Sequence, residues 1–573
     1  MDRKKHPREL EDASVELVEE ARREAFDAEQ QAAAVRQELA RTKGALHALE
    51  GKEIAPLVGK LSNAWRSSEP QPERTPRMVD DPVYRHIVLD AATATVVSHP
   101  LVQRLNYIKQ LSFSYLQFPS STHSRLAHSL GAAKNAELAM QGIFDRGKCY
   151  TSRGEEDLAP GILAARTAHT KKAKITALLH DLGHGPFGHA LDKYIGFRNA
   201  ADPRPSPDKH YTVKYLEAYL RATLEHEMVT LDPKEIAAIL RPEHRDKLQG
   251  LDSLIADVVD SPLDVDRMDY LIRDAHMTGL SMGFTNIMAL LDRMCPYRQG
   301  GKYLLTYDYS AVPYIEHFLY ARDAMFINCY EHPRKLAAER VFTRIVDSLL
   351  SDESLGISEE DLVGLTDEQI MVLLSGIGSG SDVRTKLVNL LIHNAEFRQV
   401  HEVSLSPLVE ERTVRIARDE LLAMSPAQLG DWIASLRSAS LASGGLSKDV
   451  RDWNEAALRG RDGNLKETYI LKPKTWEELI AGKSIGDQRA WQILVVVPSY
   501  EVYLAELSAT RILVEEPSGG FRIRQFFEVS SIMREVLENL MVQRRKIRVF
   551  CPADVPPAEE TAIKKAAIQV LGQ

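Results

Sequence analysis

The 573-residue chain is poor in cysteine and has no long apolar run. Its four cysteines, Cys149, Cys295, Cys329 and Cys551, are far apart and never in CxxC spacing, so neither a disulfide framework nor a thiolate zinc site is expected. No segment approaches the roughly 18 apolar residues of a membrane-spanning helix. The N-terminus lacks the apolar core and the cleavage site of a secretory signal. We therefore expect a protein of the reducing cytoplasm, without a membrane partner.

A long basic run is missing as well. The sequence has 81 acidic against 72 basic residues, a formal net charge of −9. Proteins that bind nucleic acid through its backbone usually carry a basic patch or stripe. A nucleic-acid partner is therefore compatible with the sequence but not favoured.

The first 65 residues predict a long helix. Between positions 8 and 50 there is no proline, a single glycine, and much Ala, Glu, Arg and Gln, which favour helix. An apolar residue recurs every seven positions, with one slip in register, at Leu10, Leu17, Ala25, Ala32, Leu39 and Leu46. This pattern fits a coiled coil or oligomer-docking helix, and it equally fits a solvated helix on its own domain. Residues 66–77, RSSEPQPERTPR, predict a linker.

The remaining chain predicts a mainly α protein in three parts. Helical periodicity over 78–350 predicts an all-helical core, and 351–490 a helical extension. After Trp491 the stretches WQILVVVPSY, ATRILVEEP, FRIRQFFEV and KIRVFCP predict strands, with SSIMREVLENLMVQ as a capped helix. Residues 491–573 should therefore form a small α+β C-terminal lobe.

The stretch KITALLHDLGHGPFGHALD, residues 174–192, concentrates ionisable side chains at the end of an apolar helix that should stop at Gly183. It contains His180, Asp181, His184 and His189. Imidazole and carboxylate together suit a divalent ion such as Fe, Mn, Ni or Mg. Taken alone, the His-Asp doublet is better explained as a histidine-rich surface turn, because such pairs are common.

Three other predicted helices carry polar or aromatic residues on one face. These residues are Arg125 and His128 at i and i+3, then Asp266, Tyr270 and Asp274 at i, i+4 and i+8, and Arg322, Phe326 and Tyr330 at the same spacing. A core-facing stripe would be aliphatic. A solvated face is the simpler alternative, but tyrosine and arginine in register suit the wall of a ligand site.

Six blocks in order carry a resemblance to a known family: RLNYIKQL, THSRLAHSLG, LLHDLGHGPFGHALD, KHYTVKYLEAYL, LDVDRMDYLIRDAH and CYEHPRK. Over about residues 78–335 the chain resembles the HD-domain deoxynucleoside triphosphate (dNTP) triphosphohydrolases. That family includes dGTPase-like bacterial enzymes and a vertebrate enzyme with a sterile-alpha motif. A weaker likeness continues to KIRVFCP. The sterile-alpha domain is absent, and the long helix stands in its place.

The resemblance implies a metal-dependent site. Its four metal ligands would be His128, His180, Asp181 and Asp266. The catalytic group would be His189, with Asp192 near it, and with His184 and His210 lining the phosphates. In this family, water attacks the α-phosphorus and releases tripolyphosphate and a deoxynucleoside. The implied roles are control of the dNTP pool or antiviral defence.

The resemblance also implies a substrate-binding wall. The phosphates would be contacted by Arg125, Arg267 and Arg322, and the 3′-hydroxyl by Gln110 and Asp274. Leu111 and Tyr270 would lie against the sugar ring, and Tyr330 would contact the base. Arg267 stands where the vertebrate relative has lysine. Because arginine can bind phosphate through two parallel hydrogen bonds, the phosphate pose or affinity should differ.

The sequence differs from the family pattern at positions that regulate the vertebrate relative. The vertebrate relative assembles on guanine nucleotides through an Asp-Thr-Pro segment and an arginine, but those positions here read Ser98-His99-Pro100 and Asn106. Guanine-triggered assembly is therefore not expected. A different nucleotide effector or constitutive assembly through the N-terminal helix remains open, with a dimer, tetramer or hexamer as outcome. Two other functions also remain open, a metal-dependent phosphodiesterase or nuclease and a nucleotide-sensing scaffold.

Overall fold

The computed structural model describes residues 51–66, 75–198, 206–377, 383–393, 396–405, 450, 472–497, 509–530, 533 and 546–572. The helix predicted over 8–50, most of the linker and most of the helix predicted in SSIMREVLENLMVQ lie outside these residues. Within them, no helix is both long and apolar enough to cross a membrane.

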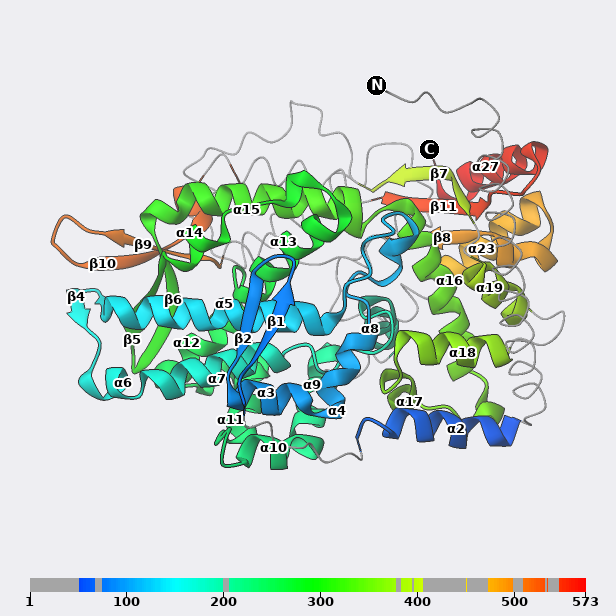
Figure 1. The fold of residues 1–573 in the computed structure, drawn as a ribbon. Helices are drawn as coiled ribbons and strands as arrows, with labels where there is room; N and C mark the ends of the chain where they lie inside the picture. Colours follow the sequence, from blue (N-terminus) through cyan, green and yellow to red (C-terminus); the bar gives the residue numbers. More distant parts are fainter. Residues whose placement is uncertain are drawn as a thin grey trace, which may run out of the picture.

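The prediction of a mainly α fold is confirmed (Figure 1). The longer helices of the core are α3 Ala91–Ser98, α5 Arg125–Arg146, α7 Arg166–Leu179, α8 His189–Arg198, α9 Pro207–Tyr219, α11 Pro233–Leu240, α12 Gly250–Val259, α13 Val265–Thr278, α15 Val312–Met325 and α16 Pro333–Leu350. Short helices connect them: α4 Pro100–Gln103, α6 Pro160–Ala164, α10 Arg221–Glu225 and α14 Ile287–Leu291. Helix α5 packs against both α7 and α13. Of the predicted metal ligands, His128 lies on α5 and Asp266 on α13, and His180 and Asp181 directly follow α7.

Capping residues define both ends of helix α5. The side chain of Ser124 accepts a hydrogen bond from the backbone N–H of Ala127, which caps the first turn. Gly147 follows the last turn at φ 64°, a left-handed conformation that suits glycine at a helix end. The capped first turn holds Arg125 and His128, both buried, beside Asp181 and Asp266.

The core, expected to be all helical, also contains strands. They are β1 Arg77–Asp81, β2 Arg85–Leu89, β3 Lys148–Thr151, β4 Gly154–Asp157, β5 Met294–Gln299 and β6 Lys302–Asp308. Gly300 and Gly301, both at positive φ, close the β5–β6 hairpin. Such a two-glycine turn is a strong hairpin signal. The sequence analysis missed this hairpin because the segments on either side of it have helical periodicity.

Two strands expected in the C-terminal lobe extend a sheet of the core instead. Strands β9 Arg511–Glu515 and β10 Phe521–Gln525 complete a six-stranded sheet in the order β10-β9-β6-β5-β3-β4, where β9 runs parallel to β6. The stretch FRIRQFFEV is a strand only in its first half, because α25 Phe526–Val529 follows directly. The local sequence pattern of a strand does not show that its partner strand lies about 200 residues away.

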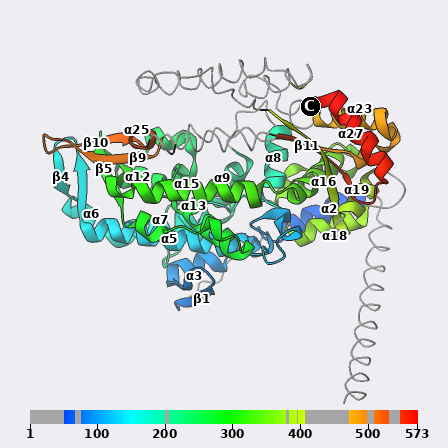
Figure 2. The same cartoon turned by 90° about the horizontal axis from the view of Figure 1, so that it is seen from above.

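The C-terminal lobe has its own hydrophobic core. Strands β7 Phe397–Ser404, β11 Lys546–Pro552 and β8 Leu494–Val496 form its sheet, and α23 Lys472–Ser484 and α27 Pro557–Leu571 pack together beside it (Figure 2). The buried Trp476 of α23 belongs to this core. Strand β7 and helix α23 come from the segment predicted as a helical extension. The division at positions 350 and 490 stays a prediction.

Helix α2 Gly51–Asn63 packs against α17 Glu359–Val363, which precedes α18 Asp367–Ile377 and α19 Val383–Ile392. Ile54 and Val58 of α2 are buried. The guanidinium of Arg66, just beyond α2, donates to the hydroxyl of Tyr215 over 2.9 Å. These contacts attach the segment before the predicted linker to the core.

Candidate active site

The His-Asp doublet lies at the end of α7. The helix ends at Leu179 rather than at Gly183, so His180 is its C-cap and Asp181 begins a turn. The Nδ1–H group of His180 donates to the carbonyl of Ala177 over 2.7 Å. That bond turns Nε2 of His180 away from its own helix, toward α5 and α13.

The four predicted metal ligands converge there. Nε2 of His128 lies 3.0 Å from Oδ1 of Asp266 and 3.4 Å from Nε2 of His180. Asp181 places Oδ1 3.2 Å from Nε2 of His180, and Oδ2 3.7 Å from Nε2 of His128. One ligand atom each from His128, His180 and Asp266 fits within 4.8 Å. Two imidazoles and two carboxylates are a donor set that suits a divalent ion.

A buried carboxylate orients His128. Nδ1 of His128 donates to Oδ2 of Asp269 over 2.8 Å, and Arg273 holds Asp269 through bonds of 2.8 and 3.0 Å. Arg273 in turn donates to Asp81 of β1 over 2.7 Å. Burial alone would lower the pKa of His128, but Asp266 and Asp269 raise it to about 10. The same negative field would favour a cation at Nε2.

A second group of ionisable residues flanks this cluster. His184 lies 3.2 Å from Asp181 through Nε2 and hydrogen-bonds Asp192 through Nδ1. His189, at the start of α8, places Nδ1 3.9 Å from Oδ2 of Asp192. Burial and the charge of Arg125 act against protonation of His184, but Asp192 and Asp181 prevail and raise its pKa to about 10.

His189 projects into the cavity. Its side chain is 64% exposed, yet protein surrounds it on the cavity walls. This desolvation, with the positive charges of His184 and Arg125, lowers the pKa of His189 well below its ordinary value. His210 lies on α9, half-buried, and is not among the residues that line the cavity. The structure thus brings together three of the four predicted catalytic residues.

Arg125 lies beside the cluster rather than in the cavity wall. Its Nη1 donates to Oδ2 of Asp181 over 2.8 Å. The side chain is 1% exposed, and its Nε and Nη2 groups have no hydrogen-bond partner among the described residues. Two unsatisfied guanidinium donors next to the cluster suit an anionic ligand.

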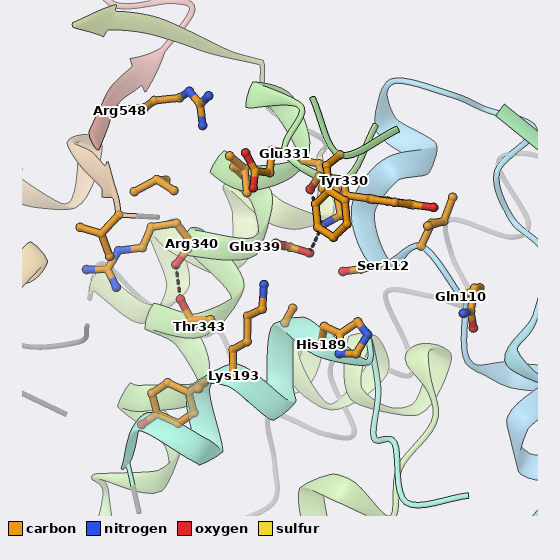
Figure 3. Close-up of a pocket in the computed structure, with 18 of the residues that line it drawn as sticks. Gln110, Ser112, His189, Lys193, Tyr330, Glu331, Glu339, Arg340, Thr343 and Arg548 are labelled. Atoms are coloured by element: carbon orange, nitrogen blue, oxygen red, sulfur yellow. Dashed lines mark hydrogen bonds and ion pairs between the residues drawn. The ribbon is translucent and has the colours of Figure 1, made fainter. Parts of the chain in front are cut away.

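The cavity has a volume of about 410 Å³, within the range of small-molecule sites (Figure 3). Its walls include seven of the eight predicted substrate-binding residues, Gln110, Leu111, Arg267, Tyr270, Asp274, Arg322 and Tyr330, as well as His189 and Asp266. Phe326 lines it too, although α15 ends at Met325 and residues 326–330 form a π-helical turn. Two of the three predicted stripes thus face one cavity, while the Arg125–His128 stripe faces the adjoining cluster.

Hydrogen bonds hold this wall in place. Tyr330 donates from its hydroxyl to Oδ2 of Asp274 over 2.8 Å, and His123 contacts Oδ1 over 2.8 Å. Nε of Arg322 donates to the hydroxyl of Tyr270 over 3.0 Å. Burial of Tyr330, reinforced by the charge of Asp274, raises the pKa of its phenol well above the usual range. Tyr330 therefore acts as a neutral donor.

Residues 125–274 match the HD domain family. The chain contains an HD domain. This segment holds the four clustered ligands, together with His184, His189 and Asp192.

Curated relatives agree with that assignment. An uncharacterised protein of Methanocaldococcus jannaschii is 26% identical over 52% of this chain and 55% of its own length. The uncharacterised YwfO of Bacillus subtilis is 28% identical over 47% and 55%. The mouse deoxynucleoside triphosphate triphosphohydrolase SAMHD1 is 24% identical over 49% and 44%. The matched region spans about half the length of these relatives. The predicted resemblance to HD-domain triphosphohydrolases is confirmed at this level of similarity.

Several residues that support the HD domain escaped the sequence analysis. Besides Asp269, the buried Arg104 donates to four backbone carbonyls, those of Leu182, His184, Val363 and Leu365, at 2.8 to 3.1 Å. It ties the turn after the His-Asp doublet to the segment after α17. In the sequence, Arg104 was notable only as the first residue of the RLNYIKQL block.

The positions where regulation was expected to differ are occupied by structural contacts. His99 is buried, and its Nδ1 accepts a hydrogen bond from the backbone N–H of Leu101 over 3.1 Å at the start of α4. Oδ1 of Asn106 accepts from the hydroxyl of Ser124 over 3.1 Å. Asn106 thus supports the capping residue of α5.

Proposed function

We propose that this protein is a metal-dependent phosphohydrolase that cleaves dNTPs to deoxynucleoside and tripolyphosphate. The observation that carries the proposal is the convergence of His128, His180, Asp181 and Asp266 beside a cavity lined by arginine, tyrosine and aspartate. Relatives at 24 to 26% identity that are named deoxynucleoside triphosphate triphosphohydrolases support the choice of substrate class.

The four ligands would hold a divalent ion. His128 and His180 each commit Nδ1 to a protein acceptor and leave Nε2 facing the carboxylates. A divalent ion in such a site lowers the pKa of water and polarises a phosphoryl oxygen. Because His128 is protonated without an ion, metal binding should release its proton.

The arginines would hold the triphosphate. Arg125 offers its two unsatisfied donors beside Asp181, and Arg267 and Arg322 project from α13 and α15 into the cavity wall. Asp264 holds the guanidinium of Arg267, and Tyr270 that of Arg322, which reduces the side-chain freedom lost on binding. Preorganised arginines would bind phosphate oxygens bidentately.

Proton transfer to the leaving oxygen is assigned to the group of His184, His189 and Asp192. His189 is the member that faces the cavity, and His184 remains protonated at neutral pH behind it. His189 has a lowered pKa and is neutral, so it would take up a proton from the neighbouring His184 as it gives one to the leaving oxygen. Asp192 accepts a hydrogen bond from His184 and holds that ring beside His189. His189 would be the catalytic residue and Asp192 a positioning residue.

Product analysis tests the proposal. Purified full-length protein is incubated in separate reactions with each dNTP, each NTP, DNA and RNA, plus Mn²⁺, Fe²⁺ or Mg²⁺, and the products are separated by ion-exchange chromatography. Tripolyphosphate with a deoxynucleoside is the expected result. Pyrophosphate with a monophosphate, cleaved DNA or RNA, or no product would overturn it. Each of these corresponds to another hydrolytic function or to a sensing scaffold.

The Asp266→Ala variant tests whether the activity depends on the cluster of predicted metal ligands. It should reduce turnover at least about a thousandfold and remove the tightly bound ion, because one of the carboxylate ligands is lost. Asp157→Ala, at a carboxylate that is 82% exposed in β4, serves as the control and should remain active. The oligomeric state, any nucleotide effector, and a role in dNTP-pool control or defence stay predictions.

A further inference from the structure

The cavity is longer than the part that the proposed function uses. Beyond Tyr330 it continues between α16 and the C-terminal lobe, where its walls carry a second set of basic residues: Lys193, Lys335, Arg340, Arg344, Lys474, Lys546 and Arg548. None of these seven is among the residues assigned to the substrate. They come from α8, α16, α23 and β11.

Two carboxylates face four of these cations. Glu477 of α23 pairs with Arg340 over 3.0 Å and with Arg344 over 3.4 Å. Glu402 of β7 pairs with Lys546 and Arg548, at 2.5 and 3.2 Å. Each carboxylate therefore serves two cations. Asp347 also lines the cavity and acts on Arg344, so the six cations other than Lys335 face three carboxylates, and an excess of positive charge remains.

Lys193 and Lys474 add to that excess. Both line the same cavity, and neither has an ion-pair partner in the part of the chain that the structure describes. Lys335, by contrast, is paired with Glu339 over 2.7 Å. An anion that enters from solvent would thus meet two uncommitted ammonium groups.

Arg340 has an unsatisfied donor at this end. Its side chain is 10% exposed, and its Nη2 group is buried without a hydrogen-bond partner among the described residues. A buried guanidinium N–H without an acceptor is unfavourable, and proteins usually supply one. Glu477 already occupies Nε of Arg340, so the missing acceptor would come from a ligand.

The two positive ends of the cavity are separate. Figure 3 shows Arg340 and Arg548 on the side of the cavity away from His189 and Gln110, with Glu331 and Glu339 between them. Although Lys335 pairs with Glu339, a phosphate chain that spanned both ends would have to pass two carboxylates, so one triphosphate would occupy one end. Arg322 belongs to the other end of the cavity, next to the cluster.

We propose that this distal end, formed by Arg340, Arg344, Lys546 and Arg548, binds the phosphate chain of a second small molecule. Arginine forks bind phosphate oxygens through paired charge-assisted hydrogen bonds. The occupant is a nucleotide or inorganic polyphosphate, since both present the same chain. Because Arg340 and Arg344 belong to α16 whereas Lys546 and Arg548 belong to β11 of the C-terminal lobe, an anion bound by both pairs would also strengthen the contact between the lobe and α16.

Titration calorimetry with inorganic tripolyphosphate tests the site. The full-length protein is titrated in EDTA, so that no ion contributes to binding at the cluster. Arg340→Gln and Arg548→Gln should each weaken binding about fivefold or more, whereas Arg340→Lys should recover most of the affinity. Arg322→Gln, at the cluster end, and Arg298→Gln, on the core sheet, should change it less than about twofold. Thermal unfolding checks that every variant is folded.

The outcomes separate this inference from the proposed function. Binding that depends on Arg340 or Arg548 supports it even if no dNTP is hydrolysed. No binding, or binding that only Arg322→Gln weakens, overturns it even if dNTPs are hydrolysed. Repeating the titration with dATP shows which molecule supplies the phosphate chain. If dATP binds more tightly than tripolyphosphate, the ligand is a nucleotide; if both bind equally, the phosphates alone are recognised.

Discussion

His128 donates from Nδ1 to Oδ2 of Asp269 over 2.8 Å, and both side chains are completely buried. The bond fixes the orientation of the His128 ring, so that Nε2 faces Asp266. A carboxylate behind a metal-binding imidazole raises its basicity and fixes its orientation. Asp269 lies in the same helical turn as Asp266, three positions on, yet it points to the opposite side of the imidazole.

Asp269→Asn should therefore weaken Mn²⁺ binding by about 10- to 100-fold, because the amide is a weaker acceptor for His128. Calorimetric titration of the metal-free protein measures the change. Asp81→Asn is the matched control, since it also removes a carboxylate from Arg273 but does not touch His128. Equal losses in the two variants would show that the network is structural only.

Gly188→Ala should impair phosphate binding. Gly188 has a φ of +47°, and a Cβ there would lie 2.2 Å from Nη2 of Arg125. The methyl group would displace the guanidinium that faces Asp181. We expect kcat/KM for dNTPs to fall about tenfold or more, with a loss of about 1 kcal/mol in stability from backbone strain. Gly161→Ala, which meets no atom within 4 Å, should leave both unchanged.

Asp274→Asn tests the proposed grip on the sugar. If the carboxylate accepts from the 3′-hydroxyl, loss of its charge should lower kcat/KM for a dNTP about tenfold or more. A 2′,3′-dideoxynucleotide has no such hydroxyl, so its kcat/KM should change less than about threefold. Steady-state assays with both substrates provide the comparison. A parallel loss for both would instead mean that Asp274 only positions Tyr330 and His123.

His99 predicts an acid-sensitive contribution to stability. Burial lowers the pKa of His99 to about 4, whereas an unfolded histidine titrates near 6.5. The contribution of the neutral ring is therefore complete above about pH 6.5 and is lost progressively as the pH falls toward 4. At pH 5 the loss amounts to about 2 kcal/mol.

Urea unfolding of the wild type and of His99→Asn at pH 7.5 and 5 measures this contribution. Asparagine retains an acceptor for the start of α4 but does not titrate. The wild type should lose about 2 kcal/mol more than the variant between the two pH values. Identical pH dependence would contradict the assignment to His99.

The sequence alone determined the mainly α fold, and it indicated the residues that gather in the candidate site. The His-Asp doublet and the three stripes are helical patterns, and residues three or four apart on a helix share a face whatever surrounds it. Because each stripe was polar or aromatic rather than aliphatic, it indicated a face toward a ligand or solvent. The Arg125–His128 stripe instead faces buried carboxylates. The order of the six blocks then pointed to the HD domain, which the match over residues 125–274 confirms.

Tertiary structure decided what lies behind and beyond the cluster. Asp269 and Arg104 act through buried hydrogen bonds to partners that local spacing does not specify. Strand β9 pairs with β6 across about 200 residues, and Lys546 and Arg548 reach the cavity from a separate lobe. Such long-range pairing depends on packing between distant segments. Local patterns record which face of an element is buried, but not which segment buries it.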